Sequence, residues 1–452
     1  MAAEITIPLV RGFSPGAMFA YREGQAVGVE AFLRDARALA ALLPDRQHVL
    51  NVSTDRYRFA VGFAAALLRR QVSLLPPTIT PDLLELLVAQ YPDVYCLSDQ
   101  PSGVEPMETV GFPQTAGGEP ATTVIPVVPE SQVAVIVFTS GSTGEPVAYR
   151  KTWGSLTRSA RAEFARLDLR ARPGMAVLGT VPPQHSYGLE STVLMVMQGG
   201  LALHARRPLL PADVRAELAA LPRPRALVTT PVHLRALLAE ADELPPADFL
   251  LCATAPLSPQ LAAQAEARFG APLYEIYGCT EAGQVATRRT VRSDEWRALP
   301  GVKMGSDSRG TWVKGGHVES EILLGDVIEL RGRGRFMLHG RTADLVNIAG
   351  KRSSLAHLNY HLNSIEGVRD GTFVVPEQDG EAVTRLTAYV VAPGLTNEAL
   401  LRALRQRIDA VFLPRPIHFV DALPRNETGK LPQLALSRIQ VELGSGPEPT
   451  RP

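Results

Sequence analysis

The chain has 452 residues, too many for one small domain, and 45% of them are hydrophobic, which is enough for large buried cores. Lysine plus arginine and aspartate plus glutamate balance at 46 each, so no excess charge favours nucleic acid or an anionic membrane surface. The three cysteines, Cys96, Cys252 and Cys279, lie far apart, which argues against a disulfide framework and favours a reducing compartment.

The N-terminal part carries no evident targeting or membrane signal. Residues 1–6 lack a basic region followed by a long apolar run, so we expect no signal peptide. The longest apolar stretch, Phe59–Leu68, is about half as long as a membrane span and predicts a buried helix. We therefore expect a cytoplasmic protein that binds neither membrane nor nucleic acid.

Short apolar runs alternate with longer segments of helical period through the middle of the chain. Val133–Phe138, Ala226–Thr229 and Leu273–Ile276 have the pattern of strands. His233–Ala241 has the pattern of a helix, and residues 211–269 follow the order helix, strand, helix, strand, helix. This alternation predicts layered α/β units with mostly parallel sheets.

After residue 315 the pattern changes to short strands joined by glycine-rich turns, which predicts a small antiparallel barrel followed by a compact α+β stretch. The expected barrel strands are Glu319–Leu324, Val327–Leu330 and Arg335–Leu338, and the later elements are a helix at Ser354–Ser364, strands at Gly371–Val375 and Thr384–Val391, a helix at Asn397–Val411 and a strand at Ile417–Val420. We therefore predict an α/β protein with a large N-terminal domain (1–340), a small α+β C-terminal domain (341–440) and a disordered tail (441–452).

The strongest local motif is a buried strand that runs into Thr139-Ser-Gly-Ser-Thr-Gly144. Glycines let the backbone approach an anion closely, and successive N–H groups and hydroxyls can surround phosphate oxygens. The segment matches neither the Walker pattern nor the GxGxxG fingerprint, so it would be a phosphate loop of another kind. The alternative is an ordinary surface loop.

A second motif, Tyr274-Glu-Ile-Tyr-Gly-Cys-Thr-Glu281, ends a predicted strand at Gly278. It leaves the Thr280 hydroxyl and the Glu281 carboxylate at the C-terminal edge of a sheet, where open α/β folds bind ligands. One carboxylate can hold Mg²⁺ together with substrate phosphates. The alternative is a helix N-cap with a glutamate in the first turn.

Three further segments carry candidate polar groups, although each one alone is an ordinary turn or a solvated charge run. An aspartate at a strand end, as in Gly325-Asp326, can accept hydrogen bonds from both hydroxyls of a ribose. Gly340-Arg341 follows it. The pair Gly429-Lys430 lies in a loop near the C-terminus, in a chain where lysine is rare.

Taken in order, TSGSTG, YGCTE, Gly-Asp, Gly-Arg and PRNETGK, within residues 130–438, resemble the adenylate-forming superfamily. That superfamily contains acyl- and aryl-CoA ligases, peptide-synthetase adenylation domains and firefly luciferase. The resemblance implies a small mobile C-terminal domain that rotates between two half-reactions. It also implies ATP and Mg²⁺ as cofactors, a carboxylic acid substrate, and a thiol acceptor on CoA or on a phosphopantetheinyl acyl carrier protein.

The resemblance also implies roles for individual residues. Thr139–Gly144 would surround the β- and γ-phosphates, Tyr277 would stack on adenine, and Thr280 would contact the α-phosphate. Glu281 would hold Mg²⁺, and Lys430 would offset the repulsion between the substrate carboxylate and the α-phosphate. The cofactor-binding residues implied in this way are Thr139, Ser140, Gly141, Ser142, Thr143, Gly144, Ala255, Pro256, Tyr277, Gly278, Asp326 and Arg341, and the catalytic ones are Lys430, Thr280 and His185.

His185 belongs to the segment His185-Ser-Tyr-Gly188, which matches the part of the family that lines the acyl pocket. The alternative for a lone histidine is a structural role.

Three departures from the family pattern mark a divergent member. Val147 stands where the phosphate loop usually has a lysine, and Arg150 or Lys151 would have to supply that charge. Ala343 stands where the family usually has the Asp or Lys of the domain hinge. Ala253-Thr-Ala-Pro256 replaces a glycine-rich adenine segment, and the region before the phosphate loop is short.

We therefore expect ATP-dependent activation of an aryl or acyl acid to its acyl-AMP and transfer to a thiol, with a preference for an aryl acid loaded on a carrier protein. The alternatives are an acyl-CoA synthetase for a fatty or hydroxy acid and a non-catalytic nucleotide-binding relative. The presence of both Lys430 and Glu281 disfavours the latter. The GxSxG match at Gly12–Gly16 suggests a serine hydrolase, but Pro15 has no N–H for an oxyanion hole.

Overall fold

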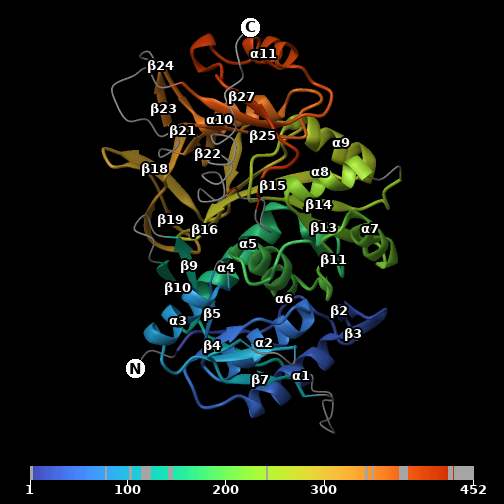
Figure 1. Cartoon of the computed structure of the whole chain (residues 1–452). Helices are drawn as coiled ribbons and strands as arrows, with labels where there is room; N and C mark the ends of the chain where they lie inside the picture. The colour runs from blue at the N-terminus through green and yellow to red at the C-terminus, as the bar shows by residue number, and fades with distance from the viewer. Residues whose placement is uncertain are drawn as a thin grey trace.

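The computed structural model has α/β architecture, with a large N-terminal domain and a smaller C-terminal domain (Figure 1). It describes residues 4–76, 79–100, 104–113, 124–140, 146–240, 243–341, 345–348, 351–375, 385–425 and 431. In Figure 1 the first sheet (blue) and the C-terminal domain (orange to red) lie at opposite ends, with the central sheet between them. The predicted domain boundary at residue 340 stays a prediction, and the predicted tail lies outside the described residues.

A six-stranded sheet forms the N-terminal end of the molecule, in the order β10-β9-β5-β4-β6-β7. Its strands are parallel except for the antiparallel hairpin β9–β10. Nearly every residue of helix α2 (Arg56–Leu68) is buried, which confirms the buried helix predicted at Phe59–Leu68. The other elements here are α1 (Val29–Leu42), β4 (His48–Asn51), β5 (Val72–Leu75), α3 (Pro81–Gln90), β6 (Tyr95–Ser98), β7 (Thr109–Gly111), β9 (Val133–Ser140) and β10 (Pro146–Thr152), with β1 (Thr6–Pro8) paired to β8 (Val127–Pro129) nearby.

An eleven-stranded sheet forms the middle of the molecule, in the order β21-β22-β17-β16-β15-β14-β13-β11-β12-β2-β3. Strands β11, β13, β14 and β15 are parallel, so their carboxyl ends share one edge. The sheet strands are β2 (Met18–Arg22), β3 (Gln25–Gly28), β11 (Ala176–Gly179), β12 (Ala202–His204), β13 (Arg225–Thr229), β14 (Phe249–Cys252), β15 (Leu273–Cys279), β16 (Gly283–Arg288), β17 (Trp296–Ala298), β21 (Asp326–Gly332) and β22 (Arg335–Arg341). The helices are α4 (Trp153–Arg166), α5 (Ser186–Gly188), α6 (Met195–Gly199), α7 (Pro211–Ala220), α8 (Pro231–Glu240) and α9 (Pro259–Phe269), and α7 to α9 confirm the order predicted for 211–269.

The largest hydrophobic core joins both sheets and the helices between them. Phe19, Phe59 and Trp153 are fully buried there, and removal of such large apolar side chains from water is the main stabilising contribution to folding. A second core packs helices α7 to α9 against the other face of the eleven-stranded sheet, with Leu234 and Phe269 at its centre.

Arg56, at the start of α2, ties the two sheets together through main-chain carbonyl groups. Its Nη2 donates to the oxygens of Gly179 (3.0 Å), the last residue of β11, and of Val181 (2.7 Å), two residues further on. Its Nη1 donates to the oxygens of His204, the last residue of β12, and of Arg206, both at 3.3 Å. Burial lowers the pKa of Arg56 to about 9.

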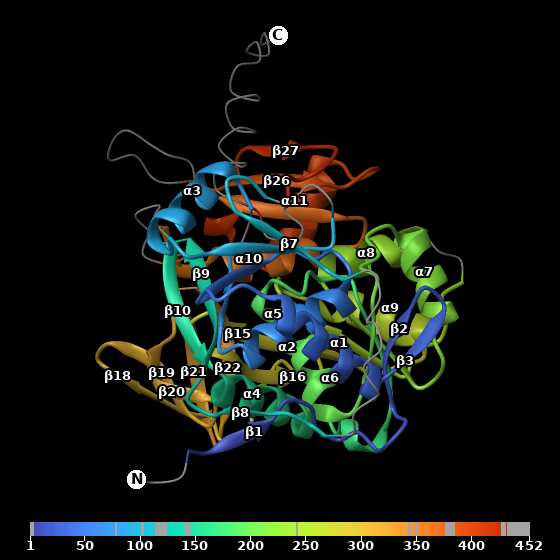
Figure 2. The ribbon, with the colours of Figure 1, turned by 90° about the horizontal axis from the view of Figure 1, so that it is seen from below.

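The strands predicted after residue 315 are antiparallel but belong to two sheets. Strands β18 (Lys303–Asp307), β19 (Gly310–Gly315) and β20 (Val318–Leu323) form a three-stranded sheet, whereas β21 and β22 extend the edge of the large sheet through β17. Figure 2 shows the hairpin β9–β10 beside these strands, and Thr152 at the end of β10 donates to Glu319 of β20 (2.8 Å).

The C-terminal domain has its own core of buried aliphatic and aromatic side chains. Its elements are β23 (Leu345–Ile348), β24 (Lys351–Ser354), α10 (Leu355–Asn363), β25 (Asp370–Val374), β26 (Thr387–Val391), α11 (Asn397–Arg405) and β27 (Ile417–Phe419). The predicted end of the helix at Val411 is wrong, because α11 ends at Arg405. Asp409 instead accepts a hydrogen bond from the Val411 N–H (3.1 Å) and begins a separate short turn. Among the described residues, no helix is both long and apolar enough to cross a membrane.

Candidate active site

The predicted phosphate loop closes the hairpin β9–β10. Thr139 and Ser140 end β9, and Ser140 pairs with Pro146 at the start of β10. The predicted loop residues Gly141, Ser142, Thr143 and Gly144 lie outside the described residues.

Tyr277 and Asp326, which the sequence predicted for adenine and ribose, contact each other directly. The Tyr277 hydroxyl donates to Asp326 Oδ2 at 2.6 Å, from β15 to the first residue of β21. Asp326 also pairs with Arg341 across strands β21 and β22, so these two predicted cofactor-binding residues are backbone neighbours. The fold therefore brings together three residues separated by up to 64 positions in the sequence.

The Tyr277 ring is packed rather than open. Its centroid lies 5.7 Å from those of Trp296 and Phe336, and the residue is 9% exposed. These contacts fix the ring plane at the sheet edge. Adenine would have to stack on the small part of the Tyr277 ring that is exposed. The adenine stacking therefore stays a prediction.

Thr280 and Glu281 lie in a tight turn between the antiparallel strands β15 and β16, so the alternative of a helix N-cap is wrong. Cys279 pairs with Gly283, and a Cβ at Gly278 would collide with the Gly283 main-chain oxygen, so the turn requires glycine there. The side chains of Thr280 and Glu281 are partly exposed.

The donor set at this turn fits a magnesium ion only as part of a nucleotide complex. Among the described residues, no group of three or more His, Cys, Asp or Glu side chains is placed to hold a metal ion. Mg²⁺ commonly uses one or two protein carboxylates and takes its remaining ligands from phosphates and water. The partly exposed Glu281 carboxylate has this character.

Lys151, on β10, is held at the same turn. Its ammonium group donates to the main-chain oxygen of Glu281, and burial lowers the pKa of the side chain. The Lys151 ammonium group is therefore held at this turn by a main-chain hydrogen bond. Of the two basic residues that the sequence offered in place of the missing loop lysine, Lys151 thus binds the Thr280–Glu281 turn.

A buried polar network lies beneath the turn and was not predicted. Glu190 accepts from Ser159 Oγ at 2.6 Å, and Glu163 accepts from Ser191 Oγ at 2.8 Å. Burial raises the pKa of both carboxyls, that of Glu163 to about 8. Gln284, the second residue of β16, donates from Nε2 to Ser191 Oγ at 2.9 Å. The network therefore anchors the strand that follows the Thr280–Glu281 turn.

The predicted adenine segment, Ala253–Pro256, follows β14 at the same sheet edge. Ala255 is partly exposed and Pro256 is exposed. Thr254 has φ of +85°, a conformation that costs a β-branched residue free energy and is more usual for glycine. The backbone thus keeps a glycine-like conformation although glycine is absent from the segment.

His185 is the residue before helix α5 and is partly exposed. Two residues later, the Tyr187 hydroxyl donates to the main-chain oxygens of Thr229 (3.2 Å) and Leu251 (3.1 Å), near the ends of β13 and β14. A Cβ at Gly188 would collide with the Pro182 oxygen, so the segment packs closely. These contacts place the His185 segment at the carboxyl edge of the parallel strands.

Lys430 lies outside the described residues, but the segment leading toward it is anchored. Arg425 makes two hydrogen bonds to the Asp370 carboxylate, at 2.7 and 2.8 Å. Arg235 of α8 lies 4.0 Å from the same carboxylate and interacts electrostatically with Cys252, the last residue of β14. The Asp370 carboxylate, which holds Arg425, is therefore the point where the C-terminal domain approaches the large domain near the predicted adenine segment.

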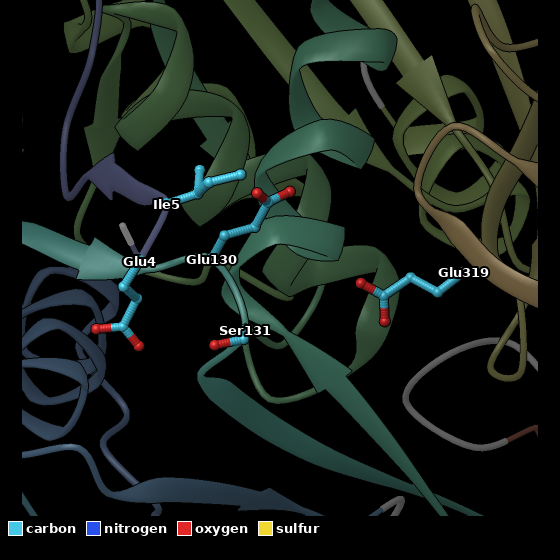
Figure 3. A pocket seen from close by; sticks show the side chains of 5 residues that line it. All are labelled: Glu4, Ile5, Glu130, Ser131 and Glu319. Atoms are coloured by element: carbon cyan, nitrogen blue, oxygen red, sulfur yellow. The ribbon is translucent and has the colours of Figure 1, made fainter. Parts of the chain in front are cut away.

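A cavity of about 370 Å³ lies away from these residues, between the N-terminal strand, the β8–β9 turn and β20. Figure 3 shows the Glu319 carboxylate extending toward the side of the cavity where Glu130 and Ser131 lie. Arg158 of α4 pairs with both Glu130 and Glu319, the latter at 3.0 Å. Glu130 and Glu319, which line the cavity, are therefore neutralised by the same arginine.

Comparison with known proteins gives two family matches. Residues 45–307 match the model of the AMP-binding enzyme, and residues 362–430 match that of the AMP-binding enzyme C-terminal domain. The chain is 30% identical over 305 residues to a 4-coumarate–CoA ligase of Rhodobacter capsulatus, covering 66% of this chain and 75% of that one. It is 24% identical over 370 residues to a 3-hydroxybenzoate–CoA/4-hydroxybenzoate–CoA ligase of Thauera aromatica, covering 72% and 70%.

The fold is also that of a solved relative. The o-succinylbenzoate coenzyme A synthetase of Bacillus subtilis, in complex with ATP and magnesium ion, superposes with a TM-score of 0.77 at 19% identity. The superposition covers 92% of this chain and 96% of that one.

Proposed function

The chain belongs to the AMP-binding enzyme family, and from that premise we propose that its acid substrate is aromatic. It is an AMP-forming acid–thiol ligase, which uses ATP to convert a carboxylic acid to its acyl-AMP and transfers the acyl group to a thiol. The aromatic class is supported by the relatives that act on coumarate and hydroxybenzoates. The test is ATP–pyrophosphate exchange across aromatic, fatty and hydroxy acids, where exchange confined to fatty acids would overturn the aromatic assignment.

The observation that carries the nucleotide site is the contact between Tyr277 and Asp326, with Arg341 opposite on the next strand. We propose that Asp326 and Arg341 bind the ribose hydroxyls and that Tyr277 lies against adenine. Ala255 and Pro256 would lie beside the edge of the base. A carboxylate held by a phenol hydroxyl has a fixed orientation, which reduces the entropy lost when a ribose binds.

Glu281 is the proposed magnesium ligand, with Thr280 beside the α-phosphate. When bound, the ion would neutralise phosphate charge as the pyrophosphate group leaves. The turn between β15 and β16 keeps both side chains at the carboxyl edge of the sheet, the edge to which the phosphate hairpin β9–β10 is linked through Lys151. The protein's part is to hold these groups in one orientation before the nucleotide binds.

Lys430 is the proposed catalytic cation for adenylation. Two anions, the substrate carboxylate and the α-phosphate, must approach each other, and one positioned ammonium group lowers the cost of that approach. The anchoring of Arg425 by Asp370 supports this assignment, because it fixes the chain five residues earlier on the C-terminal domain, at a carboxylate that lies 4.0 Å from Arg235 of the large domain. His185 would line the acid pocket.

The acceptor is a thiol, carried by CoA or by the phosphopantetheine arm of a carrier protein. The names of the relatives support CoA, and the short divergent form of the chain supports a carrier protein. Incubation of the enzyme with acid, ATP and either CoA or a phosphopantetheinylated carrier protein with a free thiol, with thioester detected by mass spectrometry, separates the two. The cytoplasmic location is part of this proposal and is supported by the three unpaired cysteines.

A further inference from the structure

The hairpin of β21 and β22 ends in an exposed, arginine-rich turn, at the end of the strands that lies away from the nucleotide site. Residues 331–335 read Arg-Gly-Arg-Gly-Arg, and all five are exposed. Gly332 pairs with Arg335, so the turn itself consists of Arg333 and Gly334. Both turn residues have positive φ, +52° and +71°, as in a type I′ turn. Asparagine, aspartate and glycine are the usual residues at the first of these positions, so the turn geometry does not explain an arginine there.

A fourth arginine extends this group across the sheet. Arg297 of β17 lies directly opposite Arg335 of β22, so the two side chains leave the same face of the sheet. Their neighbours Trp296 and Phe336 are buried in the core on the other face. Arg297 is exposed, and like charges placed directly opposite each other destabilise a pair of strands. An anionic partner outside the chain would relieve this repulsion.

Only part of this charge is balanced within the chain. The arginine tip is the group Arg297, Arg331, Arg333 and Arg335. Arg331 pairs with Glu329 at 3.0 Å. Arg335 pairs with Glu295 at 3.1 Å. Within the ranges that the structure describes, neither Arg297 nor Arg333 forms an ion pair. The tip therefore keeps two unbalanced positive charges, although the whole chain has a formal net charge of zero.

The shape of the arginine tip favours a protein partner over a small ligand. A Cβ at Gly332 would meet no atom within 4 Å, so the turn projects into open space. Small-molecule sites are concave and largely apolar, whereas the rings of Trp296 and Phe336 beside the tip are 4% and 0% exposed. A nucleic acid needs a longer basic stripe than four arginines with two glutamates among them. Exposed charges on a projecting surface instead steer and orient a protein of opposite charge.

The distance from the arginine tip to the nucleotide site suits the thiol acceptor of the reaction. Strand β21 runs from Asp326, the proposed ribose residue, to Gly332 at the tip. At about 3.4 Å per residue, the strand places the tip about 20 Å from Asp326. An extended phosphopantetheine arm has a similar length. A carrier protein bound at the tip would therefore stand where its arm can bring the thiol to the nucleotide site.

We propose that the arginine tip is a docking surface for the acidic face of an acyl carrier protein, whose phosphopantetheine thiol accepts the acyl group. This assignment rests on the proposed function, and it selects the carrier protein over CoA as the acceptor. Arg297 and Arg333 contribute the unbalanced charge, while Arg331 and Arg335 are held by their glutamates. Docking affects transfer to the carrier alone, because the tip lies away from the residues proposed for adenylation.

The chain offers a matched pair of variants for this surface. The hairpin of β2 and β3 has the same kind of turn, in which Glu23 has φ of +51° and Gly24 has φ of +76°. Glutamate is therefore compatible with this turn, so Arg333→Glu should fold. Glu23→Arg is the reciprocal control, because it reverses the charge at the other exposed turn. A second variant, Arg297→Gln, removes the charge opposite Arg335 and should be at least as stable as the wild type.

The experiment measures acyl transfer to three thiols, namely a phosphopantetheinylated acyl carrier protein of net negative charge, CoA and free pantetheine. Arg333→Glu should raise the KM for the carrier on the order of tenfold at low salt, and Arg297→Gln should raise it by a smaller factor. The increase should diminish as the salt concentration approaches about 1 M, where the Debye length is about 3 Å. Pyrophosphate exchange and the KM values for CoA and pantetheine should keep their wild-type values. Glu23→Arg should change none of these quantities.

A carrier KM that is unchanged in Arg333→Glu would overturn the proposal, as would a wild-type enzyme that transfers the acyl group to CoA and to no carrier protein. A higher KM for CoA without one for pantetheine would assign the tip to the phosphates of CoA instead. RNA binding that Arg333→Glu abolishes, with the carrier KM unchanged, would assign it to nucleic acid. If Arg333→Glu does not fold, Arg297→Gln decides. A wild-type protein that exchanges no pyrophosphate with any acid would instead refute the proposed function.

Discussion

Replacing Glu163 with glutamine should flatten the dependence of the protein's stability on pH. Glu163 is fully buried, and burial raises the pKa of its carboxyl from 4.5 to about 8. Between about pH 5 and pH 8 the folded protein therefore holds a proton that the unfolded chain has released. Because the native state binds more protons in this range, the free energy of unfolding falls as pH rises, by about 1.4 kcal/mol per pH unit for this one group.

The contacts of Glu163 explain why a neutral side chain suits the site. The Gln284 side chain lies within hydrogen-bonding range, yet Glu163 Oε2 and Gln284 Oε1 find no partner among the described residues. When Glu163 is protonated, its carboxyl gains an O–H group, so one of these two unpaired acceptor oxygens becomes a hydrogen-bond donor. Glutamine has the same size and supplies N–H donors at every pH, so it should replace the protonated acid.

The assay is urea unfolding of both proteins between about pH 5.5 and pH 7.5, followed by tryptophan fluorescence. Over this range the free energy of unfolding should fall with pH more steeply for the wild type than for Glu163→Gln. The difference in slope should be that of one proton, about 1.4 kcal/mol per pH unit. Glu321→Gln is the control, because hydrogen bonds from Arg309 hold the pKa of that exposed carboxyl below 4.5. Equal slopes for the wild type and Glu163→Gln would refute the reasoning.

Glu281→Gln should keep the fold but lower pyrophosphate exchange on the order of 10²-fold, because one charge partner of the transition state is lost; an unchanged Mg²⁺ dependence would contradict the assignment. Lys430→Ala should lower exchange by roughly 10²–10³-fold while thiol transfer from a supplied acyl-adenylate stays near normal. A parallel loss of both activities, with the fold intact, would assign Lys430 a structural role. Thr254→Gly should raise the free energy of unfolding by about 1 kcal/mol, because it relieves a φ of +85°; urea midpoints that coincide would show that the strain is absent.

Much of the fold could be predicted because hydrophobic period and strand length are local properties. The helices and strands of residues 211–269 follow in the predicted order, and α9 begins where Ser258 caps the Leu261 N–H (3.2 Å). The end of α11 was missed because it depends on one side chain, Asp409, that competes with the helix for a backbone N–H.

The candidate site could be predicted only in part. The order of the motifs along the sequence indicated that Tyr277, Asp326 and Arg341 belong to one nucleotide site. It did not indicate the hydrogen bond between Tyr277 and Asp326, because that bond depends on the positions of β15 and β21 in the sheet. Lys151 and Glu281 are separated by 130 positions, and no local pattern joins them. Glu163 was missed because its helix is rich in arginine, which suggests an exposed face.

The contacts of Arg56 bear on how the protein is synthesised. A nascent chain leaves the ribosome from its N-terminus, so α2 emerges more than a hundred residues before Gly179, Val181, His204 and Arg206, whose oxygens receive the Arg56 guanidinium. Until then the first sheet has no place to bury that cation, although domains usually fold as units during translation. The acceptors that bury Arg56 are thus supplied by β11 and β12, which are synthesised after the first sheet. A fragment ending at β10 would expose the face of the first sheet that these later strands cover.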